Sequence, residues 1–238
     1  MSFLFSHSRL LLPAAALLAM QATAAEPKSE GLTAAQILER LAKTYSSSQT
    51  YRDTGVVTTV YIEADGKRSV ERPFTTAFIR PDRLRFEYRD KIINNKERHY
   101  IIWTAAGQIQ TWWDVTPGVK KPKSLARALA GAKLVSGGSA HTVPALLLPN
   151  EVIGTRLTDL SDGTRLPDDK LDALDCFRIQ GKLDETSVTL WIDNAAGLLR
   201  RLDSTEKFEK FRTETTTTYD PVINAEVPAK LLDFNPPK

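Results

Sequence analysis

The stretch from Arg83 to Arg89, RLRFEYR, alternates strictly between charged and apolar side chains. Neighbouring residues of a β-strand point to opposite faces of a sheet, so one face of this strand is apolar and the other is charged. Such a strand suits an antiparallel sheet that packs one face on a core and leaves the other face in water. The sequence therefore predicts a sheet with one solvated face.

The same period of two extends over most of the chain. Turn signals such as Asp65-Gly66 and Arg80-Pro81-Asp82 separate the runs, and residues 194–197 are typical of a hairpin loop. Residues 161–171 are polar and contain Pro and Gly, so we expect a loop there. The expected strands span residues 55–63, 70–80, 83–89, 98–104, 109–114, 151–159, 175–181, 186–193, 198–207 and 211–219.

Two segments have the period of a helix instead. Residues 33–36 form a capping box, Thr-Ala-Ala-Gln, and apolar residues follow it at helical spacing up to Tyr45. Between Pro122 and Pro149, Ser124 can cap a second helix that ends near Gly137 and precedes the apolar run 143–149. This insertion divides the strands into two halves. About ten strands in meander order with two helical pieces predict a strongly curved antiparallel sheet wrapped around helices.

Residues 1–25 have the layout of a cleavable secretory signal peptide. Arg9 gives the start its positive charge, and the apolar run 10–19 is too short to span a bilayer, which needs roughly 20 residues. Small residues then allow cleavage after Ala24 or Ala25, and no cysteine lies there to carry a lipid anchor. We therefore expect residues 26–238 to be one exported, unanchored domain.

Charge and residue usage argue against several classes of protein. Lys plus Arg number 32 and Asp plus Glu 29, a balance that disfavours nucleic acid as the partner. Cys176 is the only cysteine, so no internal disulfide is possible, and its strand-like surroundings favour a small packing residue over a reactive thiol. His99 and His141 have no partner at metal-ligand spacing, and no nucleophile elbow, phosphate loop or dinucleotide fingerprint occurs. We expect no enzyme activity, metal or cofactor.

Four stretches in this order carry a resemblance to a known family: residues 37–45 before the long first strand, 78–87 (FIRPDRLRFE), 188–202 (VTLWIDNAAGLLRRL) and 227–237. Together they span nearly the whole of residues 26–238. The chain resembles the LolA/LolB-like superfamily of periplasmic lipoprotein carriers and its outer-membrane lipoprotein-sorting relatives. The resemblance implies a mainly β (α+β) fold, an incomplete antiparallel β-barrel with an N-terminal helix and a central helical insertion as lids over an apolar cavity.

The resemblance also implies a role for Arg80. In the family's carriers the arginine of the Arg-Pro pair bonds to the lid and holds the empty cavity closed. The alternative is that Arg80 simply ends a strand before a turn-forming proline. Both interpretations stay open from the sequence alone.

The expected function is binding or carrying of a lipid, an acylated protein or another amphiphile in the periplasm, with a membrane-bound delivery or acceptor protein as a further partner. The alternative is an envelope sensor or protein-interaction domain that uses the same sheet without catalysis. In the pair Trp112-Trp113 one ring must point away from the apolar face. The candidate ligand-lining residues are Leu84, Phe86, Tyr88, Ile102, Trp113, Leu190 and Ile192, with Leu125 and Leu129 on a lid.

Overall fold

The computed structural model describes residues 31–90, 96–105 and 107–237. The chain divides into a unit of residues 1–31 and a unit of residues 32–238, and all helices and strands given below belong to the second. The expected signal peptide and its cleavage site lie outside the described residues. Among the helices described, none is both long and apolar enough to cross a membrane.

One antiparallel sheet of twelve strands dominates the second unit. Its strand order is β6-β5-β4-β3-β2-β1-β11-β10-β9-β8-β7, with β12 paired to β1, so β1 and β11 join the two halves and the edges β6 and β7 stay apart. The strands are β1 (Thr50–Glu63), β2 (Gly66–Ile79), β3 (Arg83–Asp90), β4 (Arg98–Ala105), β5 (Gln108–Trp113), β6 (Thr116–Lys120), β7 (Ser161–Leu171), β8 (Leu174–Leu183), β9 (Thr186–Asp193), β10 (Leu199–Lys207), β11 (Arg212–Tyr219) and β12 (Val222–Ile223).

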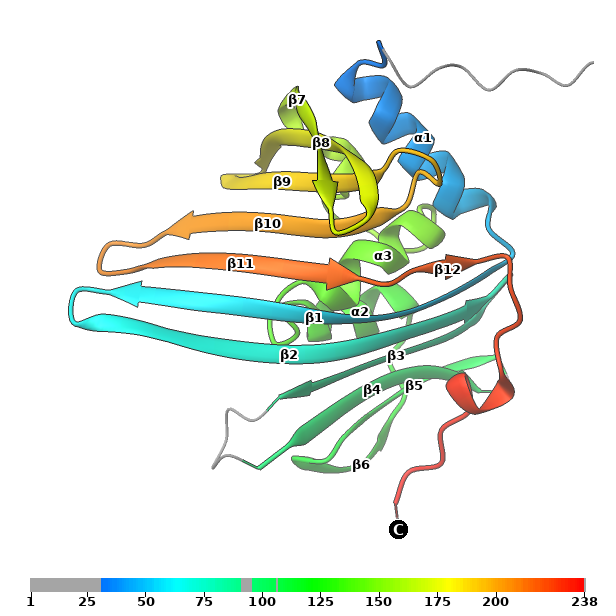
Figure 1. Ribbon diagram of the computed structural model, residues 1–238. Helices are drawn as coiled ribbons and strands as arrows, with labels where there is room; N and C mark the ends of the chain where they lie inside the picture. The colour runs from blue at the N-terminus through cyan, green and yellow to red at the C-terminus, as the bar shows by residue number, and fades with distance from the viewer. Residues whose placement is uncertain (1–30, 91–95, 106, 238) are drawn as a thin grey trace, which may run out of the picture. The chain divides into compact units, whose positions relative to one another are not determined.

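Three helices cover the inner face of this sheet. They are α1 (Ala34–Ser47), α2 (Leu125–Lys133) and α3 (Ser139–Leu147), and α2 and α3 lie within the curl of the strands (Figure 1). The capping box forms as expected, because Thr33 and Gln36 satisfy each other's backbone N–H groups. Ser124 caps α2 by accepting from the backbone N–H of Arg127. The short 3-10 helices are η1 (Leu157–Asp159) and η2 (Ala229–Leu231).

The curved antiparallel sheet with helical lids is confirmed, but two segments contradict the sequence-based expectations. Residues 151–159 form turns and η1 rather than a strand, because Glu151 and Val152 both donate to the carbonyl of Leu148 and continue the turn after α3. Residues 161–171 form strand β7 rather than a loop. An edge strand needs only one partner, here β8, and its mostly exposed side chains explain the polar sequence. The strand β6 was not expected, and α3 takes up most of the apolar run 143–149.

A single large cluster of buried apolar residues fills the space between the sheet and the helices. The alternation that opens the sequence is visible in it: Leu84, Phe86 and Tyr88 are all 1% exposed or less. Cys176 is also fully buried in β8, and burial raises the pKa of its thiol. A raised pKa keeps the thiol protonated and unreactive, which agrees with a packing residue. Burial of this inner face supplies the main driving force for the fold.

Arginine side chains pin α1 to the second half of the sheet. Arg40 donates to the carbonyl oxygens of Asn194 and Ala195 in the β9–β10 turn, at 2.9 and 2.6 Å. Arg165 on β7 donates to the carbonyl of Leu32, just before the helix, at 2.7 Å. The hydroxyl of Tyr45 accepts from the backbone N–H of Leu199. The helix is therefore held along its length by polar contacts as well as by its apolar stripe.

The carboxylate of Asp53 lies inside this core. Asp53 on β1 is 5% exposed and accepts from the Tyr51 hydroxyl at 2.8 Å and from the backbone N–H of Thr76 at 2.9 Å. Burial raises the pKa of Asp53 from 3.8 to about 6, although these hydrogen bonds partly oppose the shift. A raised pKa means that the folded protein binds the proton more tightly than the unfolded chain does. Stability from this group is therefore present below about pH 4 and is lost as pH rises through about 6.

Replacement of Asp53 by Asn should remove this pH dependence. Because the amide stays neutral, we expect the free energy of unfolding of Asp53→Asn to fall less than that of the wild type between pH 4 and pH 7, by on the order of 3 kcal/mol. Urea denaturation at a series of pH values measures this difference. Asp65→Asn, in the exposed β1–β2 turn, is the matched control. Equal pH slopes for wild type and Asp53→Asn would contradict the argument.

Candidate functional site

The inner face of the sheet brings most of the predicted lining residues together. Trp113 is half-buried and its ring packs edge-on against Tyr100, 6.2 Å between centroids, beside the cluster. The helices α1, α2 and α3 supply the opposite side of the same cluster. The eight remaining candidates are members of the single buried cluster: Leu84, Phe86, Tyr88, Ile102, Leu125, Leu129, Leu190 and Ile192.

Arg80 bridges the ends of two helices. Its Nε donates to the carbonyl oxygen of Ser48, the C-cap of α1, and its terminal nitrogen donates to the carbonyl oxygen of Leu147 at the end of α3, both at 3.0 Å. Carbonyls at a helix C-terminus lack partners within the helix and attract a cation. One side chain at the end of β2 therefore ties α1 and α3 to the sheet and to each other.

A pocket of about 410 Å³ lies farther along the same inner face, toward the β10–β11 hairpin. Threonine and serine side chains of β1, β10 and β11 form its floor, and Thr215 donates to Thr59 across the strands at 3.2 Å. Leu157, Leu183 and Leu202 line it and also belong to or pack on the buried cluster, so the pocket adjoins the apolar core. Such a volume is typical of a small-molecule site. None of the nine candidate residues lines this pocket.

The helical insertion forms the opposite wall of the pocket. Gly137 has φ 64°, a conformation that favours glycine, and a Cβ there would lie 2.8 Å from Cγ1 of Val57. His141 on α3 also lines the pocket, and burial lowers the pKa of its imidazole, which favours the neutral form. The alternating threonines of residues 213–217 were the sequence signal for this site, but threonine is common in strands and carries no ligand signal by itself.

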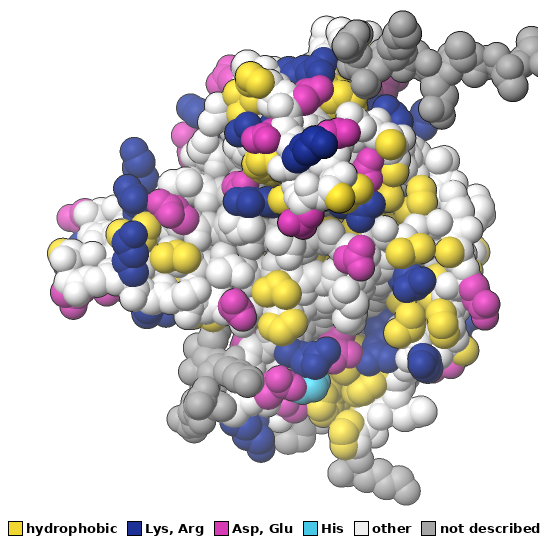
Figure 2. Space-filling model, in the orientation of Figure 1, with side chains coloured by type: hydrophobic (Ala, Val, Ile, Leu, Met, Phe, Trp, Pro, Cys, Tyr) yellow, Lys and Arg dark blue, Asp and Glu magenta, His cyan; other side chains and the backbone are white. Residues whose placement is uncertain are grey.

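The rim of the pocket carries exposed apolar side chains. Leu134 is 90% exposed and Phe208 is 48% exposed, and the Phe208 ring stacks on Phe211 with centroids 4.4 Å apart. In the space-filling view the hairpin tips show basic and hydrophobic side chains next to one another (Figure 2). Exposed groups of this kind around a pocket mark a place where a ligand or a partner can make contact.

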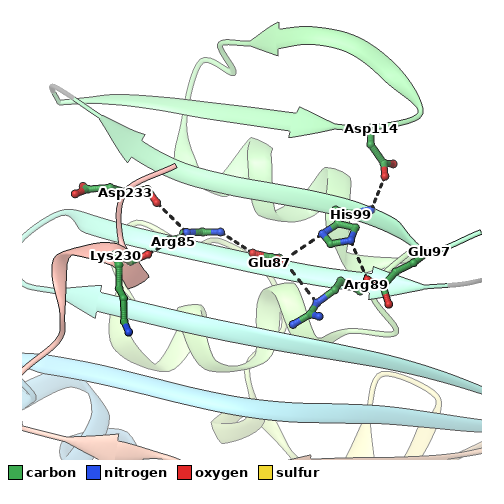
Figure 3. A network of polar contacts seen from close by, with 8 residues as sticks. All are labelled: Arg85, Glu87, Arg89, Glu97, His99, Asp114, Lys230 and Asp233. Carbon is green, nitrogen blue, oxygen red and sulfur yellow. Dashed lines mark hydrogen bonds and ion pairs between the residues drawn. The ribbon is translucent and has the colours of Figure 1, made fainter. Parts of the chain in front are cut away.

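The C-terminal segment covers the outer face of β3, β4 and β5. The ring of Phe234 packs on Trp103 and Trp112, with centroid distances of 5.0 and 5.4 Å. Arg85 on β3 donates to the carbonyl of Asp233 at 2.8 Å and to the Glu87 carboxylate at 2.6 Å (Figure 3). The two neighbouring tryptophans therefore face opposite sides, with Trp112 covered by the C-terminal segment and Trp113 on the inner side.

The same outer face holds a small ionic network around Glu87. Its carboxylate lies 3.6 Å from Arg89 and 3.4 Å from Nδ1 of His99, while Nε2 of His99 lies 3.0 Å from Glu97 (Figure 3). These contacts fasten β3 to β4. No group of three or more His, Cys, Asp or Glu side chains arranged to hold a metal ion occurs among the residues that the structure describes.

No protein-family model matches the chain, and no curated protein matches it either. Solved structures similar to it include LprF from Mycobacterium bovis, with 16% identity and a TM-score of 0.46 over 82% of this chain and 94% of that one. A LolA superfamily protein from Nitrosomonas europaea has 10% identity and a TM-score of 0.33 over 85% of this chain and 98% of that one.

A third similar structure is MucB in complex with MucA(peri), with 12% identity and a TM-score of 0.36 over 85% of this chain and 60% of that one. No residue's role in this chain rests on these similarities, which concern the fold. The chain is similar, at a distance, to proteins of the LolA-like superfamily that its sequence motifs resemble.

Proposed function

We propose that this protein is a non-enzymatic carrier that binds a lipid, an acylated protein or another amphiphile against the inner face of its sheet. The observation that carries the proposal is the contact of Arg80 with the ends of both α1 and α3. Because Arg80 fastens the end of α3 to the sheet, breaking its bonds can release the helical insertion and offer the covered apolar face to a ligand. The nine candidate lining residues would then contact the apolar part of the ligand.

The magnitudes are compatible with such an exchange. Hydrogen bonds to a charged group contribute about 1.5 to 3 kcal/mol each, so the two bonds of Arg80 contribute about 3 to 6 kcal/mol. Burial of acyl chain contributes about 0.8 kcal/mol per methylene. Roughly four to eight buried methylenes therefore offset the loss of both bonds. An ordinary acyl chain is long enough to displace the latch.

The pocket and its apolar rim support the same proposal. The pocket adjoins the buried cluster, so an acyl chain that enters beside Leu134 can reach the core along the leucines of the pocket. We further propose that the chain acts in the periplasm after removal of residues 1–25, and that it exchanges its ligand with a membrane-bound partner. The exposed rim residues are the surface that such a partner would touch.

The alternative function is a sensor or interaction domain that binds a protein on the same sheet. The exposed side chains of Leu134 and Phe208 favour it, since apolar rims also bind proteins. Co-purification separates the two functions. A carrier yields amphiphiles in an organic extract, whereas an interaction domain yields a stoichiometric protein partner and no lipid.

The first experiment is mass spectrometry of organic extracts from the protein purified from a bacterial periplasm. We expect acyl-containing species in amounts near one per protein. A parallel titration measures binding of a fluorescent fatty-acid analogue by the delipidated protein, because a preformed apolar site enhances its emission. Empty extracts together with no binding of the analogue would contradict a carrier function.

The second experiment tests the latch. Arg80→Leu removes both hydrogen bonds from the closed, empty form, so the loaded form becomes relatively more favourable and we expect retention of the fluorescent analogue to increase about 100- to 10,000-fold. Arg83→Leu is the matched control, because this nearby arginine is exposed and its ion pair with Asp233 is exposed as well. If Arg80→Leu and wild type release the analogue at the same rate, Arg80 is not a latch.

A further inference from the structure

Arg72 on β2 is a buried cation of the inner face, beneath the helical insertion. It is 7% exposed and lies opposite Val57 of β1, so it projects from the inner face that carries the core. Its Nε is buried without a hydrogen-bond partner, and nowhere in the described residues does Arg72 form a hydrogen bond or an ion pair. A buried arginine ordinarily has such partners, because taking an unpaired charge out of water is costly. An unexplained group of this kind indicates a missing acceptor.

The hydroxyl of Tyr88 on β3 is a second buried donor without an acceptor in the described residues. Tyr88 is 1% exposed, its hydroxyl has no hydrogen-bond partner in the described residues, and burial raises its pKa well above the ordinary value. The phenol therefore stays protonated and can donate. Tyr88 is the cross-strand partner of Phe74, and Arg72 lies two residues before Phe74 on β2. Arg72 and Tyr88 therefore lie diagonally across neighbouring strands, about 7–8 Å apart at their backbones. Both side chains are long enough to meet one acceptor.

Arg98 on β4 adds a third unpaired group. Arg98 lies two residues before Tyr100, which is the cross-strand partner of Tyr88. It therefore lies diagonally from Tyr88, on the strand that flanks β3 opposite to β2. Its Nε is also buried without a partner. Asp90 on β3 lies next to these residues and has a polar interaction of its own. The carboxylates of Asp90 and Asp114 both lie close enough to raise the pKa of Tyr88, and they partly balance the two guanidinium groups.

The position of Arg72 connects this cluster to the pocket. A terminal nitrogen of Arg72 would lie 3.9 Å from a Cβ built on Gly137, and Gly137 is part of the pocket wall. The guanidinium therefore lies directly beneath the loop between α2 and α3. Movement of that loop, which the proposed carrier function requires, would expose the arginine to a ligand in the pocket.

We propose that Arg72, Tyr88 and Arg98 bind the anionic head group of the amphiphile, a carboxylate or a phosphate. This inference rests on the proposed carrier function and adds the ligand class to it. The planar guanidinium suits both groups, because it donates two parallel hydrogen bonds to paired oxygens. A neutral head group supplies no charge and cannot satisfy two arginines. The protein should therefore prefer anionic amphiphiles over neutral ones with the same chain.

The test compares ligands that share one acyl chain. Displacement of the neutral fluorophore N-phenyl-1-naphthylamine gives the affinities of oleate, oleoyl lysophosphatidic acid and oleyl alcohol, each below its micelle concentration. We expect wild type to bind one or both acids at least about tenfold more tightly than the alcohol. The two acids show whether the site takes a carboxylate or a phosphate.

Arg72→Met keeps the length and the apolar stem while it removes the donors. We expect it to abolish the preference for the acids and to leave the affinity for oleyl alcohol unchanged, and Tyr88→Phe to weaken the preference by less. Arg89→Met, on the outer face of β3 and paired with Glu87, is the control and should behave as wild type. Thermal unfolding provides the second readout: added oleate should raise the melting temperature of wild type and not that of Arg72→Met.

The outcomes separate the two proposals. Equal binding of acid and alcohol by wild type overturns the head-group site and leaves the carrier function standing. The same holds if Arg72→Met weakens the acids and the alcohol alike, or if Arg89→Met loses the preference as well. Failure of all three ligands to bind overturns the carrier function together with the head-group site.

Discussion

Burial of the inner face of the sheet is the constraint on which the rest of the structure depends. The sheet gathers one large cluster of apolar side chains on its inner face, and this surface must be kept from water. The sheet is too strongly curved to be covered by a second flat layer. Three helices, one before the sheet and two inserted between its halves, provide the cover instead, and their positions follow from the shape that they fill.

The outer face of the sheet is more polar than the inner face. It carries charges that pair with one another, as around Glu87, and the rings of Trp103 and Trp112 on it are covered by Phe234. Buried nitrogens without a partner occur on both faces, since Nε of Arg85 on the outer face is one of them. Arg85 still pairs with Glu87 through another nitrogen, whereas Arg72 on the inner face forms no hydrogen bond or ion pair within the described residues, and the hydroxyl of Tyr88 near it has no partner there either. Donors left unpaired on the side that the helices cover are the reason to place the ligand there.

Much of the fold could be predicted from local patterns. Alternation in residues 83–89, the capping box at Thr33 and the turn at residues 194–197 each report a backbone conformation that depends on near neighbours, and each prediction is confirmed. Residues 151–159 and 161–171 were predicted wrongly because their conformation is decided elsewhere. The first segment continues the turn that ends α3, and the second becomes a strand only because β8 lies beside it. Edge position, which no local pattern reveals, makes polar residues acceptable in a strand.

The candidate site divides in the same way. The sequence by itself determined which side chains face the core, because a period of two assigns each residue to one face, and its resemblance to the carrier family drew attention to Arg80. Only the tertiary structure decided that Arg80 reaches the ends of two helices, that threonines from three strands share one pocket floor, and that Arg72 and Arg98 flank Tyr88. The physical reason is strand register. Residues far apart in the chain become neighbours through backbone pairing across the sheet, and the chemistry of the inner face arises from these pairings.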